Sequence, residues 1–316
     1  MASDLTISVT PPLLSVPSVE FPTERARVEQ VCCPQINEQS LQTYKDPKFR
    51  ATLFGLLCEE TTTRLLFKIE YLKSQFEAVL KGSTAEVNAR FPDLPCPRNT
   101  AVKVNALYLH ANYVRDKDAK RIFVASQLPT DPALFWRFVL NEGYNILDLY
   151  NQESFYYPSS EGTPLVLSNI EVKLIETFGQ TTDEYSHTYL VHDLSTDQKE
   201  IITRCHFTGW PTHAVVDVPI LDYLVNKLET PLSGNTLVHC LAGYGRTGTV
   251  LAAFLLKQRL LKKPSLDLAD LGPLLQDLLV HLRGQRGLHF VESKEQYFLL
   301  LDYGIFILRQ RENPLT

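Results

Sequence analysis

The residues best suited to chemistry lie in one short segment, where Cys240 follows an apolar stretch and Arg246 comes six residues later. Gly243 and Gly245 stand between them and allow the backbone to turn, so that successive N–H groups point inward. We expect a strand before this loop, over 236–239, and a long helix after it. The unpaired N–H groups at the start of such a helix, with its positive dipole end, add to an anion-binding nest. The segment therefore predicts a site for a phosphate group.

The side chains of this loop have distinct tasks in such a site. Cys240 would lie at the strand end beneath the N–H groups, where the local field favours the thiolate, which is the nucleophilic form. Arg246 can offer a bidentate fork to two phosphoryl oxygens, which Lys could not. The hydroxyl of Thr247, beside the sulfur, can donate a hydrogen bond to the thiolate when it leaves again. The predicted anion-binding residues are Leu241, Ala242, Gly243, Tyr244, Gly245 and Arg246.

A strand–turn–helix junction without chemistry could also contain a Cys followed by an Arg six residues later. The complete string H-C-x-A-G-x-G-R-T-G, from His239 to Gly248, is too specific for that alternative. Within this string, His239 is expected to be a buried residue that orients the loop rather than a catalyst.

Hydrophobic periodicity predicts the elements that position this loop. Short apolar runs indicate strands, and apolar residues at three- and four-residue steps indicate helices. Strands are predicted over 107–114, 121–125, 144–149, 165–178, 185–194, 201–207 and 236–239. Helices are predicted over 131–141, 247–262, 266–283 and 294–310. This order indicates an α/β (α+β mixed) fold, in which a central twisted mixed sheet is flanked by helices.

The chain divides into three predicted parts. Residues 1–35 are rich in Ser, Thr, Pro and Val without a helical period, which predicts a flexible N-terminal arm. Residues 36–87 have apolar residues at helical spacing, mainly from 46 to 81, and we expect them to pack on the following domain rather than to form a partner-binding bundle. Residues 88–316 form the domain that carries the cysteine loop.

The composition excludes several classes of function. A formal net charge of −5 gives no reason to expect a nucleic-acid partner, because binding to a phosphate backbone depends on clustered Lys and Arg. No uninterrupted apolar run approaches the ~18 residues needed to cross a bilayer, so no membrane insertion is expected. The amino-terminal residues lack the order of a signal peptide. We therefore expect a soluble, cytoplasmic protein.

The six cysteines indicate reduced thiols. None of them has C-x-x-C spacing, so neither a zinc site nor a disulfide framework is predicted. The pairs Cys205-His206 and His239-Cys240 would point to opposite faces of their strands, which disfavours a shared metal ion. No metal and no cofactor are expected.

The loop string resembles the signature of the cysteine-dependent, phosphotyrosine-specific family of protein-tyrosine phosphatases. Arg90-Phe91-Pro92-Asp93 is similar to that family's phosphotyrosine-recognition loop. Residues 108–114 are similar to its Y-I-N-A-S-Y-I strand, and residues 123–127 with 135–137 are similar to its next block. The resemblance covers residues 88–310.

The resemblance implies a protein-tyrosine-phosphatase-like catalytic domain, with the catalytic loop between a strand and a helix N-terminus. It also implies hydrolysis of phosphotyrosine through a cysteinyl-phosphate, so phosphotyrosine-containing proteins are the expected partners. In this family Phe91 would be the aromatic wall of a cleft deep enough for phosphotyrosine, and Asp93 would hold the substrate's backbone amides. From the residues alone, Phe91 fits a core or turn residue and Asp93 a turn former.

The largest departure from the family pattern is in the general-acid loop. The chain has Trp210-Pro211-Thr212-His213, and the family places Asp at the position of Thr212. That Asp protonates the departing phenolate, whose pKa of about 10 makes unassisted departure costly, and Thr cannot usefully donate the proton. His213 is a candidate substitute, although the family often has His there beside an intact Asp. Asp217 would need the loop to refold.

A second departure is in residues 286–296, which resemble the family's water-positioning loop. Glu292 takes the place of its first Gln, and Gln296 matches its second. A carboxylate cannot donate to the water and it repels a phosphoryl dianion, so hydrolysis of the cysteinyl-phosphate is also expected to be slow. The spacing of Gln296 from Arg286 resembles that of secreted bacterial tyrosine phosphatases, which makes delivery into another cell as an effector the alternative localisation.

The sequence thus favours a tyrosine phosphatase with attenuated turnover. The alternative hypothesis is a catalytically weak or dead pseudophosphatase that binds phosphotyrosine, motivated by Thr212 and Glu292 together. An inositol-phosphate or phosphoinositide phosphatase is disfavoured because loop positions 241, 242 and 244 carry no Lys to meet extra phosphates. A structural scaffold is the remaining hypothesis.

Overall fold

The computed structural model describes residues 88–312, with short gaps at 95, 118–119, 159, 180–182, 212–213, 231, 233 and 288. Every described residue belongs to one compact unit. The arm predicted over 1–35 and the helical segment predicted over 36–87 lie outside the described residues.

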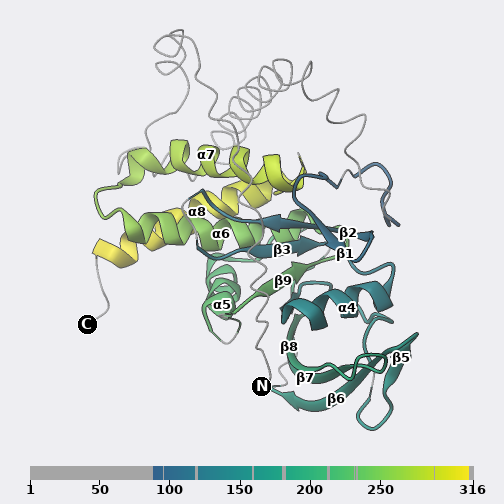
Figure 1. Ribbon diagram of the computed structural model, residues 1–316. Coiled ribbons are helices and arrows are strands. Elements are labelled where there is room, and N and C mark those ends of the chain that lie inside the picture. Colours follow the sequence, from purple (N-terminus) through teal and green to yellow (C-terminus); the bar gives the residue numbers. More distant parts are fainter. Residues whose placement is uncertain are drawn as a thin grey trace, which may run out of the picture. The chain divides into compact units, whose positions relative to one another are not determined.

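In the described residues, nine strands form one sheet in the order β1-β2-β3-β9-β4-β8-β7-β6-β5 (Figure 1). The pairs β3–β9, β9–β4 and β4–β8 are parallel, and the other pairs are antiparallel. The predicted mixed sheet is therefore confirmed. The strands are β1 (Ala101–Val104), β2 (Leu107–Val114), β3 (Phe123–Ser126), β4 (Asn145–Asp148), β5 (Leu165–Leu167), β6 (Ile170–Phe178), β7 (Glu184–Asp193), β8 (Lys199–Phe207) and β9 (Thr236–His239).

Two hydrophobic cores lie on the two faces of this sheet. Helix α4 (Pro132–Glu142) packs into one core and contacts β1, β6, β7 and β8. The second core contains α5 (Val218–Glu229), α6 (Gly245–Lys262), α7 (Leu268–Arg286) and α8 (Lys294–Glu312). Alternate residues of each strand face opposite cores: in β3, Val124 belongs to the α4 core, whereas Phe123 and Ala125 belong to the other. Helices therefore flank both faces of the sheet, as predicted.

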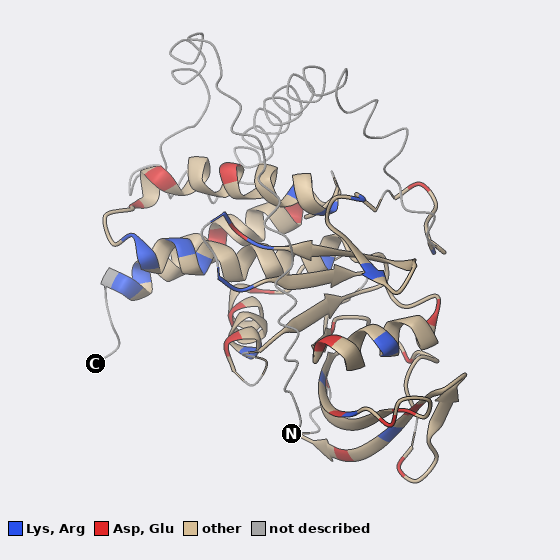
Figure 2. Ribbon diagram, in the orientation of Figure 1, with Lys and Arg blue, Asp and Glu red and all other residues tan. Residues whose placement is uncertain are grey.

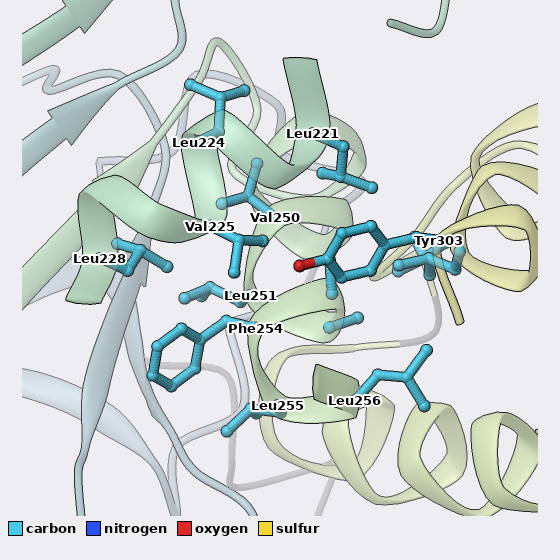
Figure 3. Close-up of a cluster of buried hydrophobic side chains, with 14 of the residues drawn as sticks. Leu221, Leu224, Val225, Leu228, Val250, Leu251, Phe254, Leu255, Leu256 and Tyr303 are labelled. Atoms are coloured by element: carbon cyan, nitrogen blue, oxygen red, sulfur yellow. The ribbon is translucent and has the colours of Figure 1, made fainter. Parts of the chain in front are cut away.

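The core around α6 fixes the helix that follows the cysteine loop. α6 is buried along most of its length, as expected for a helix that is apolar on nearly all sides. Burial of each aliphatic side chain in this core contributes roughly 1.5–3 kcal/mol. Figure 3 shows part of this core, formed by Leu221, Leu224, Val225 and Leu228 of α5, Val250, Leu251, Phe254, Leu255 and Leu256 of α6, and Tyr303 of α8.

The two ends of α6 differ in charge. Arg259 and Lys262 lie in its last turn, and Arg309 and Arg311 lie in the last turn of α8, where cations complement the negative end of a helix dipole (Figure 2). At its start α6 has no acidic residue, and its N-cap, Tyr244, makes no capping hydrogen bond with its side chain. The amino end of α6 therefore keeps N–H groups that an anion can use.

Most predicted elements are confirmed within a few residues, and some are corrected. The prediction of one strand over 165–178 is wrong, because β5 and β6 form a hairpin in which Leu167 pairs with Ile170. Ser168 takes a φ of 57° in this turn, a conformation that a Ser in a sequence does not signal. Strand β1 and helix α5 are absent from the predicted elements. Yet α5 has clear signals, with Asp217 as N-cap and a Pro in its first turn.

Candidate active site

Residues 240–246, the nucleophile loop, run from the carboxyl end of β9 into the first turn of α6. β9 lies between β3 and β4 in the parallel part of the sheet. In open α/β sheets, ligands bind beyond the carboxyl ends of parallel strands. Cys240 is buried, and its Sγ accepts a hydrogen bond from the N–H of Gly243 at 3.3 Å. The predicted nucleophile therefore has an inward-pointing backbone donor, as an anion nest requires.

Gly243 and Gly245 are held where a larger residue would not fit. Gly243 has a φ of +77°, and a Cβ atom there would lie 2.2 Å from the carbonyl oxygen of Ser126. At Gly245 a Cβ atom would lie 2.9 Å from Gln296 Nε2 and 3.2 Å from Glu292 Oε2. The nucleophile loop is thus packed between the end of β3 on one side and residues 292–296 on the other.

Tyr244 can serve the predicted anion site only through its backbone. Its ring is fully buried, and the guanidinium of Arg286 lies 4.5 Å from the ring centroid. Its carbonyl oxygen accepts hydrogen bonds from the N–H groups of Gly248 at 2.8 Å and Val291 at 3.3 Å. The side chain therefore anchors the loop in the protein interior.

A buried cation, Arg286, lies directly behind the nucleophile loop. Its Nε donates to the carbonyl oxygen of Gly243 at 3.3 Å, and its Nη1 donates to Asn112 Oδ1 at 2.5 Å. Its Nη2 lies 3.2 Å from His110 Nδ1, and burial and the charge of Arg286 lower the pKa of His110 to about 4. All these partners are neutral, so the charge of Arg286 favours an anion in the loop. This residue was not among the predicted site residues, since a single Arg near a Gly gives no distinct signal.

The predicted phosphate-binding Arg246 is held by acceptors from two other loops. Its Nη1 donates to the carbonyl oxygen of Leu149 at 2.8 Å, and lies 3.4 Å from Asn151 Oδ1 and from the carbonyl oxygen of Trp210. Its other guanidinium nitrogens make no hydrogen bond to the residues that the structure describes. Arg246 thus ties the loop after β4 and the general-acid loop to the nucleophile loop.

Thr247 lies fully buried in the first turn of α6. Its hydroxyl oxygen makes no hydrogen bond within the described part of the chain. A buried hydroxyl without a partner is uncommon and costs ~1–3 kcal/mol, which fits a group kept for a ligand or a thiolate. The role of Thr247 as a donor to Cys240 stays a prediction.

Both predicted residues of the general-acid position, Thr212 and His213, lie outside the described residues. Their flanks are held by Trp210, which is fully buried and donates from Nε1 to the carbonyl oxygen of Ala214 at 2.9 Å. Asp217 accepts a backbone N–H of α5 at 2.9 Å as the N-cap of that helix. Its carboxylate is therefore engaged in the fold and is unsuited to replace the missing acid.

The predicted water-positioning residues, Glu292 and Gln296, meet the nucleophile loop at its Gly245. Gln296 Oε1 accepts the N–H groups of Glu292 at 2.9 Å and Ser293 at 3.3 Å, and Ser293 Oγ accepts the N–H of Gln296 at 3.2 Å. This reciprocal pattern is a capping box at the start of α8, and it leaves the amide NH₂ of Gln296 for the loop. Val291 has a φ of 61°, a strained conformation for a β-branched residue that is found mainly at functional sites.

The predicted recognition residues share a support with the nucleophile loop. Phe91 is half-buried and Asp93 is exposed. Gln127, directly after β3, accepts the backbone N–H of Arg90 at 3.1 Å. The end of β3 also packs on Gly243. The same strand therefore holds both the nucleophile loop and residues 90–93, the recognition turn. The substrate contacts of Phe91 and Asp93 stay predictions.

A cavity of about 280 Å³ opens beside the nucleophile loop. Its wall is joined to the loop by a hydrogen bond from the N–H of Leu128 to the carbonyl oxygen of Leu241 at 3.0 Å. Leu241 and the following Ala242 are half-buried. The lining combines apolar and oppositely charged side chains: Arg90, Leu128, Tyr150, Glu153, Ser154 and Phe155. None of these was among the predicted site residues.

In the part of the chain that the structure describes, no group of three or more His, Cys, Asp or Glu side chains could hold a metal ion. Cys96, Cys205 and Cys240 are free thiols there. Burial raises the pKa of Cys96 and of Cys205, which makes these two poor nucleophiles. No described helix is both long and apolar enough to cross a bilayer.

Comparison with known proteins agrees with this geometry. A family model described as protein-tyrosine phosphatase matches residues 86–305. Tyrosine-protein phosphatase non-receptor type 20 of Homo sapiens is 26% identical over 263 residues, which are 78% of this chain and 60% of the relative. Receptor-type tyrosine-protein phosphatase eta of Gallus gallus is 28% identical over 231 residues, which are 66% of this chain and 15% of the relative. Tyrosine-protein phosphatase Lar-like of Caenorhabditis elegans is 31% identical over 209 residues, which are 62% of this chain and 9% of the relative.

The chain therefore spans 60% or less of the length of these relatives. The family model, in contrast, covers more than half of the chain, including the recognition turn, the nucleophile loop and residues 292–296. The resemblance to the family is confirmed, whereas the secreted bacterial effector type stays a prediction. The chain belongs to the protein-tyrosine phosphatase family.

Proposed function

We propose that this protein hydrolyses phosphotyrosine in proteins through a cysteinyl-phosphate on Cys240, with attenuated turnover. The observation that carries the proposal is the place of Cys240, whose buried sulfur accepts a backbone N–H in front of the uncapped amino end of α6. Arg246 lies in the same loop, where its guanidinium can form a bidentate pair with phosphoryl oxygens, and Arg286 adds positive charge from behind. Membership of the family supports the same chemistry.

The reaction has two steps. In the first, the Cys240 thiolate attacks phosphorus, the bond from phosphorus to the tyrosine oxygen breaks, and its electron pair leaves with the phenolate. The loop N–H groups and Arg246 stabilise the equatorial phosphoryl oxygens. In the second, water attacks phosphorus and gives up a proton to solvent, the P–S bond breaks, and the thiolate returns with Thr247 as its hydrogen-bond donor.

Two residues are expected to slow these steps. Thr212 cannot protonate the phenolate, and loss of a positioned general acid removes roughly 10²–10⁴ of the rate. Glu292, against Gly245, presents a carboxylate where an amide would orient the attacking water. The first effect concerns formation of the cysteinyl-phosphate, and the second concerns its hydrolysis.

The proposed substrate is a phosphotyrosine side chain within a protein. Phe91 would stack on its ring and Asp93 would hold the neighbouring backbone. The cavity between Arg90 and Phe155 lies beside the nucleophile loop and would receive a residue that flanks the phosphotyrosine. Because Cys240 must be a thiol to react, we propose that the protein works in a reducing compartment such as the cytoplasm.

Kinetics with two kinds of substrate test this function. An aryl phosphate with a strongly acidic leaving group needs little protonation, so we expect it to be turned over. Phosphotyrosine peptides should react more slowly by roughly 10²–10⁴-fold in kcat, because only they need the missing acid. No turnover of the acidic aryl phosphate would contradict the function, and equal kcat values would contradict the attenuation alone.

A phosphotyrosine-binding pseudophosphatase is the second candidate, favoured by Thr212 and Glu292 together. It requires measurable affinity for phosphotyrosine peptides without hydrolysis of either kind of substrate. Isothermal titration calorimetry with a phosphotyrosine peptide and its unphosphorylated form measures this affinity. Equal heats from the two peptides would eliminate the pseudophosphatase hypothesis. An inositol-phosphate or phosphoinositide substrate stays less favoured, since positions 241, 242 and 244 are not Lys.

A further inference from the structure

The cavity beside the nucleophile loop, the side cavity, has the size of a site for one side chain. Its volume of about 280 Å³ is just below the ~300 Å³ at which pockets for small-molecule ligands begin. Its lining comes from three parts of the chain: Arg90 from the recognition turn, Leu128 from the segment after β3, and Tyr150, Glu153, Ser154 and Phe155 from the loop after β4.

Each of these three parts is tied to the nucleophile loop. The N–H of Leu128 donates to a carbonyl oxygen of that loop at 3.0 Å. The backbone N–H of Arg90 donates at 3.1 Å to the side chain of Gln127, the residue before Leu128. The loop after β4 is held by Arg246, which donates to the carbonyl oxygen of Leu149 at 2.8 Å. The side cavity therefore has a fixed place relative to the nucleophile, which is what selective binding requires.

Two polar atoms of the lining are buried without a hydrogen-bond partner among the described residues. They are Arg90 Nε and Ser154 Oγ. Buried polar atoms nearly always have a partner in folded proteins, so two exceptions in the lining of one cavity indicate groups that bind something else. An arginine N–H and a serine hydroxyl can both donate. The side cavity is therefore suited to an acceptor oxygen.

The lining also carries one charge of each sign, and neither is paired within the part of the chain that the structure describes. Arg90 and Glu153 have no ion pair there within 4.0 Å, either with each other or with another residue. A ligand group must therefore meet a cation that donates and, at a separate point, an anion that accepts.

A carboxamide matches both charges. The carboxylate of Asp or Glu would pair with Arg90 but would meet the like charge of Glu153, and the ammonium of Lys would have the opposite conflict. An apolar side chain would leave the buried polar atoms without partners. The oxygen of a carboxamide accepts from Arg90 and Ser154, and its NH₂ donates to Glu153. Glutamine adds methylene groups that can lie on Phe155, which is 62% exposed.

We propose that the side cavity is a specificity site for a glutamine side chain near the phosphotyrosine of the substrate. Arg90 and Ser154 donate to the amide oxygen, and Glu153 accepts from the amide nitrogen. Glu153 thereby excludes the acidic residues that Arg90 alone would select. The place of this glutamine in a substrate rests on the proposed function, whereas the affinity of the cavity for a carboxamide does not.

Peptide binding to Cys240→Ser tests the preference without turnover. Each of the three positions on either side of phosphotyrosine carries Gln, Glu, Lys or Leu in turn, with Ala elsewhere, and fluorescence anisotropy measures Kd. At one of these positions Gln should bind roughly 10-fold more tightly than Leu, as expected for a few net hydrogen bonds, and also more tightly than Glu and Lys. If Gln is the tightest binder at no position, the side cavity holds only water and the proposal is wrong.

Glu153→Gln should reverse the choice between Gln and Glu at that position. Without the carboxylate, a substrate Glu can pair with Arg90, so it should bind roughly 10-fold more tightly than to the parent protein. Glu200→Gln is the matched control, because it removes the same charge from an exposed residue near the amino end of β8. An unchanged preference in Glu153→Gln, or the same change in both variants, would overturn the proposal.

NMR of the Arg90 side chain tests the cavity without phosphotyrosine. Its Nε–H signal is identified by its loss in Arg90→Lys, which keeps the charge. Titration of the wild type with N-acetylglutamine methylamide, up to its solubility limit, should shift this signal, and N-acetylnorleucine methylamide should not. No shift with the glutamine compound, or equal shifts with both, would overturn the proposal. A shift here without peptide binding to Cys240→Ser would instead contradict the proposed function and leave the carboxamide site in place.

Discussion

Replacing Cys240 with Ser should reduce kcat/KM for both phosphotyrosine peptides and acidic aryl phosphates by at least ~10⁴-fold. The donor from Gly243 and the amino end of α6 stabilise a thiolate, but they cannot ionise a serine hydroxyl at neutral pH. Serine is nearly the size of cysteine, so the loop should keep its shape. Steady-state kinetics with either substrate measure the effect.

Binding measurements show whether the loss is chemical. Cys240→Ser should still bind a phosphotyrosine peptide, because Arg246 and the loop N–H groups remain. Cys205→Ser is the matched control: Cys205 is also buried in the sheet, on β8, and its replacement should leave kcat within several-fold of the wild type. Retained turnover in Cys240→Ser would show that another group is the nucleophile.

Replacing Thr212 with Asp should raise kcat on phosphotyrosine peptides by roughly 10²–10⁴-fold. The new carboxyl group would protonate the leaving phenolate, whereas an acidic aryl phosphate should gain little. Because a general acid works only when protonated, the gain should fall as the pH rises through the pKa of the introduced carboxyl group. Rapid-mixing and steady-state kinetics across pH check both expectations.

Thr212→Asn separates proton transfer from shape. Asn is close in size to Asp but is not an acid, so it should give no gain on the peptide. An equal gain from Asn and Asp would show that loop geometry, and not a proton donor, was limiting. If Thr212→Asp does not raise kcat, the rate is limited by hydrolysis beside Glu292 or by closure of the general-acid loop.

The sequence predicts the nucleophile loop well because its chemistry and its backbone depend on the same few residues. Gly243 is required by its φ of +77° and by the nearness of Ser126, so the glycine that makes the nest is visible in the string itself. The parallel strand before Cys240 and the buried helix after it are also strongly apolar. These local signals are enough to predict the centre of the site and the mixed sheet.

The supports of the site are harder to predict, because they come from distant parts of the chain. The neutral partners of Arg286, and the carbonyl oxygen of Leu149 that holds Arg246, have no sequence pattern of their own. Asp148 did leave a signal, since it is a charge directly after the apolar residues of β4, whereas Arg204 lies in a strand with several other polar residues. Only the register that pairs both strands with β9 shows that these charges meet beside His239.

Trapping the reaction intermediate tests the central claim most directly. The protein is mixed with an acidic aryl phosphate, whose transfer to Cys240 does not need the missing acid, quenched in acid within the first turnover, and digested for mass spectrometry. A cysteinyl-phosphate intermediate predicts a phosphate adduct on the peptide that contains Cys240, and slow hydrolysis beside Glu292 should help it to accumulate. Release of phosphate with no adduct on Cys240, or with an adduct on another residue, would contradict the account.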